Sequence, residues 1–125
     1  MNAIIQNFKE IVTDKYAMFK GRAGKAEFWQ YVLVYVIISL VFYLIVTAFG
    51  SVKVLSILFQ ILNAIVGLAL LVPSLAVSVR RMHDIGKGGG WIFINLIPII
   101  GFIWYIVLAV KDGEPEANRF GEPVK

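Results

Sequence analysis

His83 and Asp84 are adjacent residues whose side chains could take part in acid–base or metal chemistry. An adjacent His-Asp pair occurs in some metal phosphohydrolases, but a metal site needs three or four converging ligands. The chain has one histidine and no cysteine, and other carboxylates such as Asp14 and Glu27 are scattered in sequence. We therefore expect no catalytic residue, no metal and no cofactor, and we expect Asp84 to pair with a nearby arginine or lysine.

Charged residues also gather near the ends of the apolar segments. Glu27 opens the first segment and Arg80 and Arg81 close the second, so antiparallel helices would bring them to the same depth. A partly desolvated carboxylate is costly unless it is paired, and an arginine fork suits it. In the alternative, the cations of this cluster bind lipid headgroup phosphates. The candidate interface charge cluster or lipid-headgroup site comprises Arg22, Lys25, Glu27, Arg80, Arg81 and Asp84.

Three apolar segments would position these charges. Between Phe28 and Val110 charge occurs only at Lys53 and within Arg80–Lys87, and each interval is roughly long enough to cross the ~30 Å hydrocarbon core as a helix. The sequence predicts an all-α membrane protein with transmembrane helices at about 28–49, 54–79 and 91–110. An alternative makes 91–110 a re-entrant hairpin that turns at Pro98–Gly101. The transmembrane domain as a whole covers residues 21–110.

Residues 1–20 are predicted to form an amphipathic interfacial helix, and residues 111–125 a polar tail. Apolar residues recur at three- and four-residue steps from Ile4 to Phe19, so they share one helical face. That face could lie on the bilayer surface or pack on the protein's own helices. Glycines and prolines in the tail indicate turns.

The second apolar segment carries a stripe of small and amide residues. Such a stripe in a spanning helix indicates helix–helix contact. In the alternative, the stripe lines a polar pathway through an oligomer, although the absence of charge within the spans disfavours a proton relay. The candidate helix-packing stripe comprises Gln60, Asn63, Gly67 and Ser74.

The distribution of lysine and arginine predicts the orientation. Five basic residues precede Phe28 and three more lie in Arg80–Lys87. The positive-inside rule therefore favours a cytoplasmic N-terminus and a cytoplasmic second loop, with the tail outside. The net charge of +4 suits an anionic membrane surface better than a nucleic acid.

Three sequence blocks occur in a distinctive order around the apolar segments. They are Gly21-Arg22-Ala23-Gly24-Lys25-Ala26-Glu27-Phe28-Trp29, then Arg80-Arg81-Met82-His83-Asp84 with Gly86 and Trp91, then Asn118-Arg119-Phe120-Gly121-Glu122-Pro123. This ordered set resembles the bacterial inner-membrane family catalogued as domain of unknown function 805. The resemblance implies a small multi-pass protein of the inner (cytoplasmic) membrane and implies no reaction. Lys25 and Gly88–Gly90 depart from the family pattern, which usually has arginine at the first position and serine near the second.

Together these features favour a non-enzymatic membrane interaction or regulatory protein. The expected partners are the lipid bilayer, including anionic headgroups, and a second copy or another membrane protein, because three short spans bury little surface alone. The alternative is an oligomeric channel or transport component lined by the second span. A metal-dependent enzyme acting through His83 and Asp84 ranks third.

Overall fold

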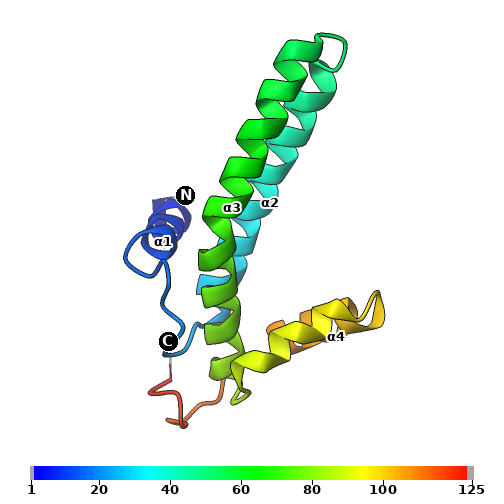
Figure 1. The fold of residues 1–125 in the computed structure, drawn as a ribbon. Helices are drawn as coiled ribbons and strands as arrows, with labels where there is room; N and C mark the ends of the chain where they lie inside the picture. Colours follow the sequence, from blue (N-terminus) through cyan, green and yellow to red (C-terminus); the bar gives the residue numbers. More distant parts are fainter. Residues whose placement is uncertain (1, 124–125) are drawn as a thin grey trace.

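The computed structural model describes residues 2–123, and the regular elements in that range are helices. An isolated backbone pair joins Asn118 to Gly121 outside any strand. The predicted all-α class is therefore confirmed (Figure 1). The elements are α1 (Asn2–Val12), α2 (Lys25–Ala48), α3 (Lys53–Asp84), the 3-10 helix η1 (Gly89–Leu96) and α4 (Ile100–Ala109).

Helices α2 and α3 form a long antiparallel hairpin that dominates the molecule (Figure 1). They contain 24 and 32 residues, and both are long and apolar enough to cross a bilayer. At about 1.5 Å per residue, α3 is roughly 48 Å long and exceeds the ~30 Å hydrocarbon core. Away from the other elements both helices expose large apolar side chains, such as Leu44 and Leu68. The spans predicted at 28–49 and 54–79 lie largely within these two helices.

Helix α3 continues beyond the predicted end of its span. Arg80–Asp84, expected at the membrane surface after the helix, form its last turn and are buried. Pro73 lies inside the helix without ending it. The helix can continue because distant groups satisfy its final turn: the backbone N–H of Ala23, for example, donates to the carbonyl of Arg80 at 2.9 Å.

The prediction of one continuous helix over residues 91–110 is wrong. The segment folds instead into η1 and α4, which pack against each other as a hairpin. Pro98 lacks an N–H and disfavours the helical conformation at Ile97, whose ψ is 112°. Gly101 allows the arms to meet, because a Cβ there would lie 1.7 Å from the carbonyl oxygen of Ile94. The hairpin turns where the alternative expectation placed it.

Helix α1 is shorter than the predicted 1–20 and is followed by turns. It packs on the long hairpin: Ile11 is fully buried and the ring of Phe8 stacks on Tyr31 at 5.5 Å. The amide of Asn7 donates to the carbonyl of Glu27 at 2.9 Å. Of the two alternatives for this segment, packing on the protein's own helices is therefore present.

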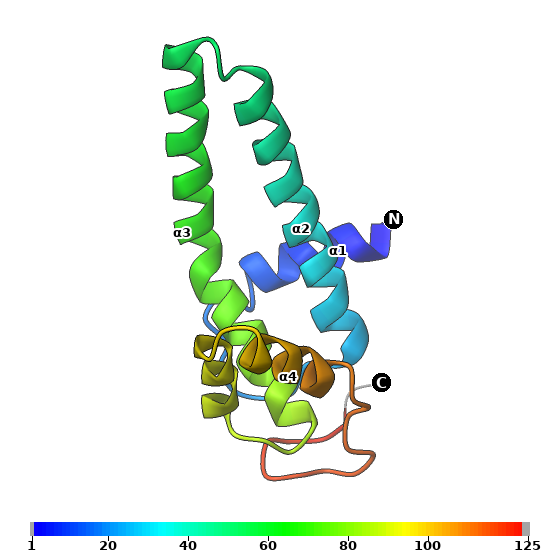
Figure 2. The ribbon, with the colours of Figure 1, turned by 90° about the vertical axis from the view of Figure 1, so that its right-hand side faces the viewer.

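The core lies at one end of the long hairpin rather than along it. Helix α1 flanks α2 and α3 on one side and the η1–α4 hairpin flanks them on another, both near the end opposite the Phe49–Val52 connection (Figures 1 and 2). The tail after α4 closes the same end. The buried cluster there consists of Ile11, Ala23, Phe28, Tyr31, Val77 and Ala109.

Candidate functional site

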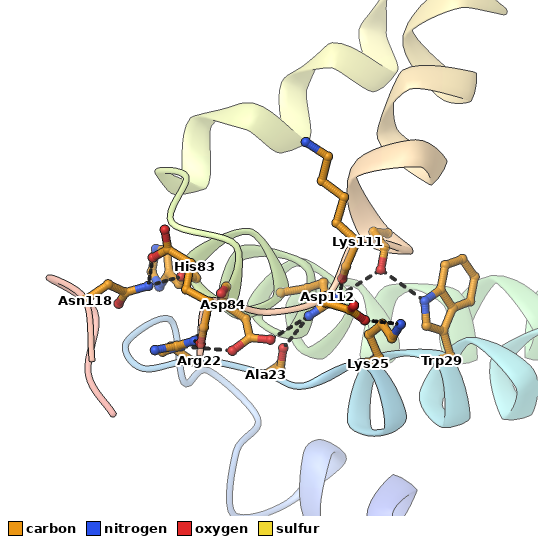
Figure 3. A network of polar contacts seen from close by, with 12 residues as sticks. Arg22, Ala23, Lys25, Trp29, His83, Asp84, Lys111, Asp112 and Asn118 are labelled. Atoms are coloured by element: carbon orange, nitrogen blue, oxygen red, sulfur yellow. Dashed lines mark hydrogen bonds and ion pairs between the residues drawn. The ribbon is translucent and has the colours of Figure 1, made fainter. Parts of the chain in front are cut away.

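The three sequence blocks come together at this closed end of the molecule. Residues before α2, the last turn of α3 and the tail contact one another through charged side chains and backbone carbonyls (Figure 3). We call the residues that make these contacts the polar cluster. They are Arg22, Lys25, Glu27, Arg80, Arg81, His83, Asp84, Asp112 and Asn118.

Asp84 is the centre of the polar cluster. Its Oδ1 accepts a hydrogen bond from Arg22 Nε at 2.9 Å, and its Oδ2 accepts one from Arg81 Nη1 at 2.7 Å. All three side chains are almost completely shielded from solvent. A lone carboxylate at the carbonyl end of a helix is unfavourable, so two cations stabilise it there.

Arg22 also ties the tail to α3. Its guanidinium donates to the carbonyls of Asp84, Glu114, Glu116 and Gly121 at 2.6–3.2 Å. The tail therefore lies at the same end as the residues that precede α2. The η1–α4 hairpin returns the chain to its starting end, whereas the sequence favoured a tail across the membrane from the N-terminal segment.

Arg81 fixes the return of that hairpin. Its Nε donates to the carbonyl of Ala109 at 3.0 Å, and its Nη2 donates to the carbonyl of Lys111. The indole N–H of Trp29 donates to the same Ala109 carbonyl at 3.1 Å. These donors satisfy the carbonyl of Ala109, the last residue of α4, and that of Lys111 just after the helix.

Glu27 lies against Arg80, one of the two arginines proposed from the sequence as its partner. Glu27 Oε2 is 2.5 Å from Arg80 Nη1 and 3.4 Å from Lys15 Nζ. Arg80 Nε donates to the carbonyl of Met18 at 3.0 Å, whereas its buried Nη2 has no partner among the described residues. The pair thus links α3 to α2 and to the turn after α1.

His83 is held by contacts of an ordinary structural kind. Its ring stacks on Phe120, with centroids 3.8 Å apart and planes at 2°, and its Nδ1 lies 2.8 Å from the carbonyl of Gly21. The amide of Asn118 donates to the His83 carbonyl at 3.0 Å. Within residues 2–123 no group of three histidine, cysteine, aspartate or glutamate side chains comes close enough to hold a metal ion.

Lys25 is the exposed cation of the predicted cluster. Its Nζ lies 2.6 Å from Asp112 Oδ1, in a pair open to solvent. The hydrogen bond and charge of Lys25 lower the pKa of Asp112 below its usual range. Arg22, Arg80 and Arg81 are buried and directed to protein groups, so of the four proposed phosphate-binding cations only Lys25 is accessible to a headgroup.

A pocket of about 720 Å³ lies beside the cluster, between α1, the start of α2 and the tail. Its lining includes the carboxylates of Glu27, Asp84 and Glu114. Each of these already has a partner: Arg80, Arg22 and Asn118 respectively. The cavity therefore presents amide and carboxylate groups to solvent without a set of free groups that converge.

The proposed helix-packing stripe does not pack within one chain. Gln60, Asn63 and Gly67 are exposed, and a Cβ at Gly67 would meet nothing within 4 Å. Ser74 alone contacts α2, where its Oγ lies 2.6 Å from the hydroxyl of Tyr31.

Sequence reasoning missed the roles of Trp29, Asn118 and Phe120. Trp29 bonds to the Ala109 carbonyl at the end of α4, whereas Asn118 and Phe120 join the third block to the second by the bond to the His83 carbonyl and by the stacking on His83. From the sequence alone, the three blocks served only as the basis of a family resemblance. Nothing local in the sequence identified which of them touch.

The fold and the polar cluster define a small helical membrane protein with two long apolar helices and one polar end. The chain belongs to the family described as "Protein of unknown function (DUF805)", whose model matches residues 16–122. It is 35% identical over 114 residues to Inner membrane protein YhaH of Escherichia coli strain K12, covering 91% of this chain and 93% of the relative. Inner membrane protein YhaI of the same strain is 30% identical over 115 residues, covering 91% and 92%. No solved structure matches the chain.

Proposed function

We propose that this protein is a non-enzymatic interaction or regulatory protein that crosses the bacterial inner membrane twice. The observation that carries the proposal is that the buried charged side chains bond to other protein groups. Arg22, Arg81 and Asp84 are buried and bonded to one another and to backbone carbonyls. They act as a lock that closes the polar end, and the apolar flanks remain for contacts with lipid or protein.

Two crossings follow from the lengths of the helices. Helices α2 and α3 can each span ~30 Å of hydrocarbon, whereas α4, with ten residues, is about 15 Å long and cannot. The η1–α4 hairpin then enters the membrane from one side and returns to it. Two crossings bring both flanking segments to one side of the membrane, in agreement with the contacts of Arg22 to the tail.

The basic residues orient this arrangement. Of the 12 lysines and arginines, only Lys53 lies at the connection between α2 and α3. All others belong to the polar end or the tail, so the positive-inside rule directs that end to the cytoplasm. The exposed cation Lys25 would meet anionic headgroups there.

Single cysteines test this topology without background, because the natural chain has none. We expect a membrane-impermeant maleimide to label Ser51→Cys in spheroplasts, where the outer membrane has been removed. Ala3→Cys, Gly90→Cys and Glu122→Cys should label only after permeabilisation. Labelling of Glu122→Cys in intact spheroplasts would contradict two crossings, and labelling of Ala3→Cys would contradict the orientation.

The non-enzymatic proposal has its own test. His83 is the residue on which a metal-dependent enzyme would rest. Purified protein and the His83→Ala variant are compared for bound transition metals by mass spectrometry of the elements. We expect the same trace content in both. A stoichiometric metal that is lost in His83→Ala would overturn the proposal.

Self-association through α3 is the proposed route to larger assemblies. The exposed amides of Gln60 and Asn63 would lie in hydrocarbon, where they lack water as a partner. An oligomer joined or lined by this face is the alternative function, a channel or transport component. Solute flux through reconstituted liposomes separates the two: flux that Asn63→Leu abolishes would favour the channel, and its absence favours the interaction protein.

A further inference from the structure

The turn of the η1–α4 hairpin is an exposed apolar tip. Leu96, Ile99, Ile100 and Phe93 are 78%, 75%, 69% and 64% exposed, the largest such values among neighbouring large side chains. Between Lys87 and Lys111 the sequence carries no charge. The amide of Asn95 donates to the carbonyl of Ile92 within η1, so its N–H group is partly satisfied by the protein itself.

The backbone at the tip is strained at Ile99, a residue type that a turn exposed to water would not favour. Ile99 has φ 64° and ψ −67°, and the N–H of Ile100 donates to the carbonyl of Pro98 at 2.7 Å. A γ-turn of this hand is rare, and a β-branched residue in it is an outlier that glycine would relieve. In water neither the backbone nor the exposed side chain favours isoleucine here. Hydrocarbon around the tip favours it, because the side chain is then removed from water.

The base of the hairpin has the composition of a membrane interface. Lys87 Nζ lies 4.6 Å from the centre of the Trp91 ring, and Trp91 and Trp104 pack with centroids 6.1 Å apart. Tryptophan and lysine are typical of the headgroup level. A hairpin about 15 Å long with this base and an apolar tip is no longer than the thickness of one leaflet, about half of the hydrocarbon core.

These features imply that the protein occupies a larger cross-section in one leaflet than in the other. Near the α2–α3 connection only two helices lie in the membrane, whereas at the polar end the hairpin projects beside them (Figure 1). We propose that the η1–α4 hairpin is a wedge in the acyl chains of the cytoplasmic leaflet, and that through it the protein senses or promotes curvature in which that leaflet is convex. This inference rests on the two-crossing topology proposed above and adds an activity to it.

The depth of the tip is tested first. Leu96→Cys and Lys87→Cys are labelled with a fluorophore in vesicles that contain lipids with nitroxide at shallow or deep acyl positions. We expect Leu96 to be quenched most by the deep nitroxide and Lys87 by the shallow one. Quenching of Leu96 by aqueous iodide would overturn the wedge. Protection from both iodide and lipid nitroxide would also overturn it, because the occupant would then be protein.

Curvature preference is tested by sorting in membrane tubes pulled from giant vesicles. Molecules with the polar end in the outer leaflet, identified by an accessible N-terminal tag, should show a tube-to-vesicle density ratio above one that rises as the tube narrows. Molecules of the opposite orientation should be depleted. A ratio of one at every radius, with Leu96 deeply inserted, would overturn the wedge while leaving the two-crossing topology intact.

A pair of matched variants assigns the effect to the tip. Leu96→Ala with Ile99→Gly removes apolar volume from the tip and relieves the strained turn, so it should fold and bring the ratio toward one. Ile57→Ala with Leu58→Ala removes similar exposed volume near the other end of α3 and should not lower the ratio. Equal loss of sorting in both double variants would contradict a role for the hairpin.

Discussion

Arg22 Nε and Asp84 Oδ1 lie 2.9 Å apart, with side chains only 1% and 4% exposed, although 62 residues separate them in the sequence. Asp84 is shared with Arg81, so one carboxylate neutralises part of two buried guanidinium groups. The rest of their hydrogen-bonding capacity goes to backbone carbonyls. This relationship makes Asp84 the residue whose loss leaves the most buried charge uncompensated.

We expect Asp84→Asn to lower the free energy of unfolding by about 3–5 kcal/mol, since it leaves two buried cations without a counter-charge. Chemical unfolding in mild detergent, followed by circular dichroism, measures the change. Asp112→Asn is the matched control: it removes the same charge from an exposed pair, so it should cost much less than Asp84→Asn. Equal effects of the two variants would argue against the buried role of Asp84.

Glu27 and Arg80 should be coupled energetically. In a double-mutant cycle with Glu27→Gln and Arg80→Gln we expect a coupling of about 0.5–3 kcal/mol, and the double variant should be more stable than the worse single one. The same cycle with Arg81→Gln should be close to additive, because Arg81 bonds Asp84 and carbonyls rather than Glu27. Additivity in both cycles would contradict an energetic coupling between Glu27 and either arginine.

Gly101→Ala should disrupt the η1–α4 hairpin. In an isolated helix alanine is more favourable than glycine by about 1 kcal/mol, but here its Cβ would collide with the carbonyl oxygen of Ile94. Near-ultraviolet circular dichroism reports the packing of Trp91 on Trp104 and should weaken. Gly90→Ala, where a Cβ has open space, should leave both the spectrum and the unfolding temperature almost unchanged.

The Lys25–Asp112 pair predicts a pH dependence. The folded pKa of Asp112 is lowered, first by the hydrogen bond from Lys25, so its stabilising contribution is present above the unfolded pKa. That contribution is lost as the pH falls through the folded pKa. In a carbon-13 titration of the aspartate carboxyls, the Asp112 midpoint should rise toward the usual range in Lys25→Gln. An unchanged midpoint would mean that the pair is not formed in solution.

Gly67 distinguishes a free α3 face from one covered by a second copy. Gly67→Leu should be tolerated by the single chain, since nothing lies within 4 Å of the added side chain. If copies associate through Asn63 and Gly67, it should reduce disulfide cross-linking at Gln60→Cys, because a bulky side chain blocks close approach. Leu68→Ala, on a different face, should leave cross-linking unchanged. Equal yields in all three proteins would contradict association through this face.

Hydropathy predicted the two long helices, because an apolar run long enough to cross a bilayer must satisfy its backbone hydrogen bonds internally, as a helix does. It failed at Arg80–Asp84, where a run of charges normally ends a span. The helix continues because Arg22, Ala23 and tail residues neutralise and cap that turn. Those partners lie far away in sequence, so local patterns do not contain them.

The shape of residues 91–110 was open to sequence reasoning but not decided by it. Pro98 and Gly101 predicted a turn as one alternative. The choice depended on the close approach of Gly101 to Ile94 and on Arg81, which holds the returning end of α4. For the candidate site the sequence predicted which charges gather, whereas the burial of Arg22 and Arg81 depends on carbonyls of the tail and of the end of α4.

The bond between Arg22 and the carbonyl of Gly121 spans 99 residues and has a consequence for biogenesis. At about 5–20 residues per second, synthesis of that interval takes roughly 5–20 seconds. During this time α2 and α3 can already enter the membrane, while Arg22 still lacks its tail acceptors. The polar end is therefore the last part of the protein to mature, and a nascent chain halted before residue 114 would display an unfinished lock to the cell's quality-control proteases.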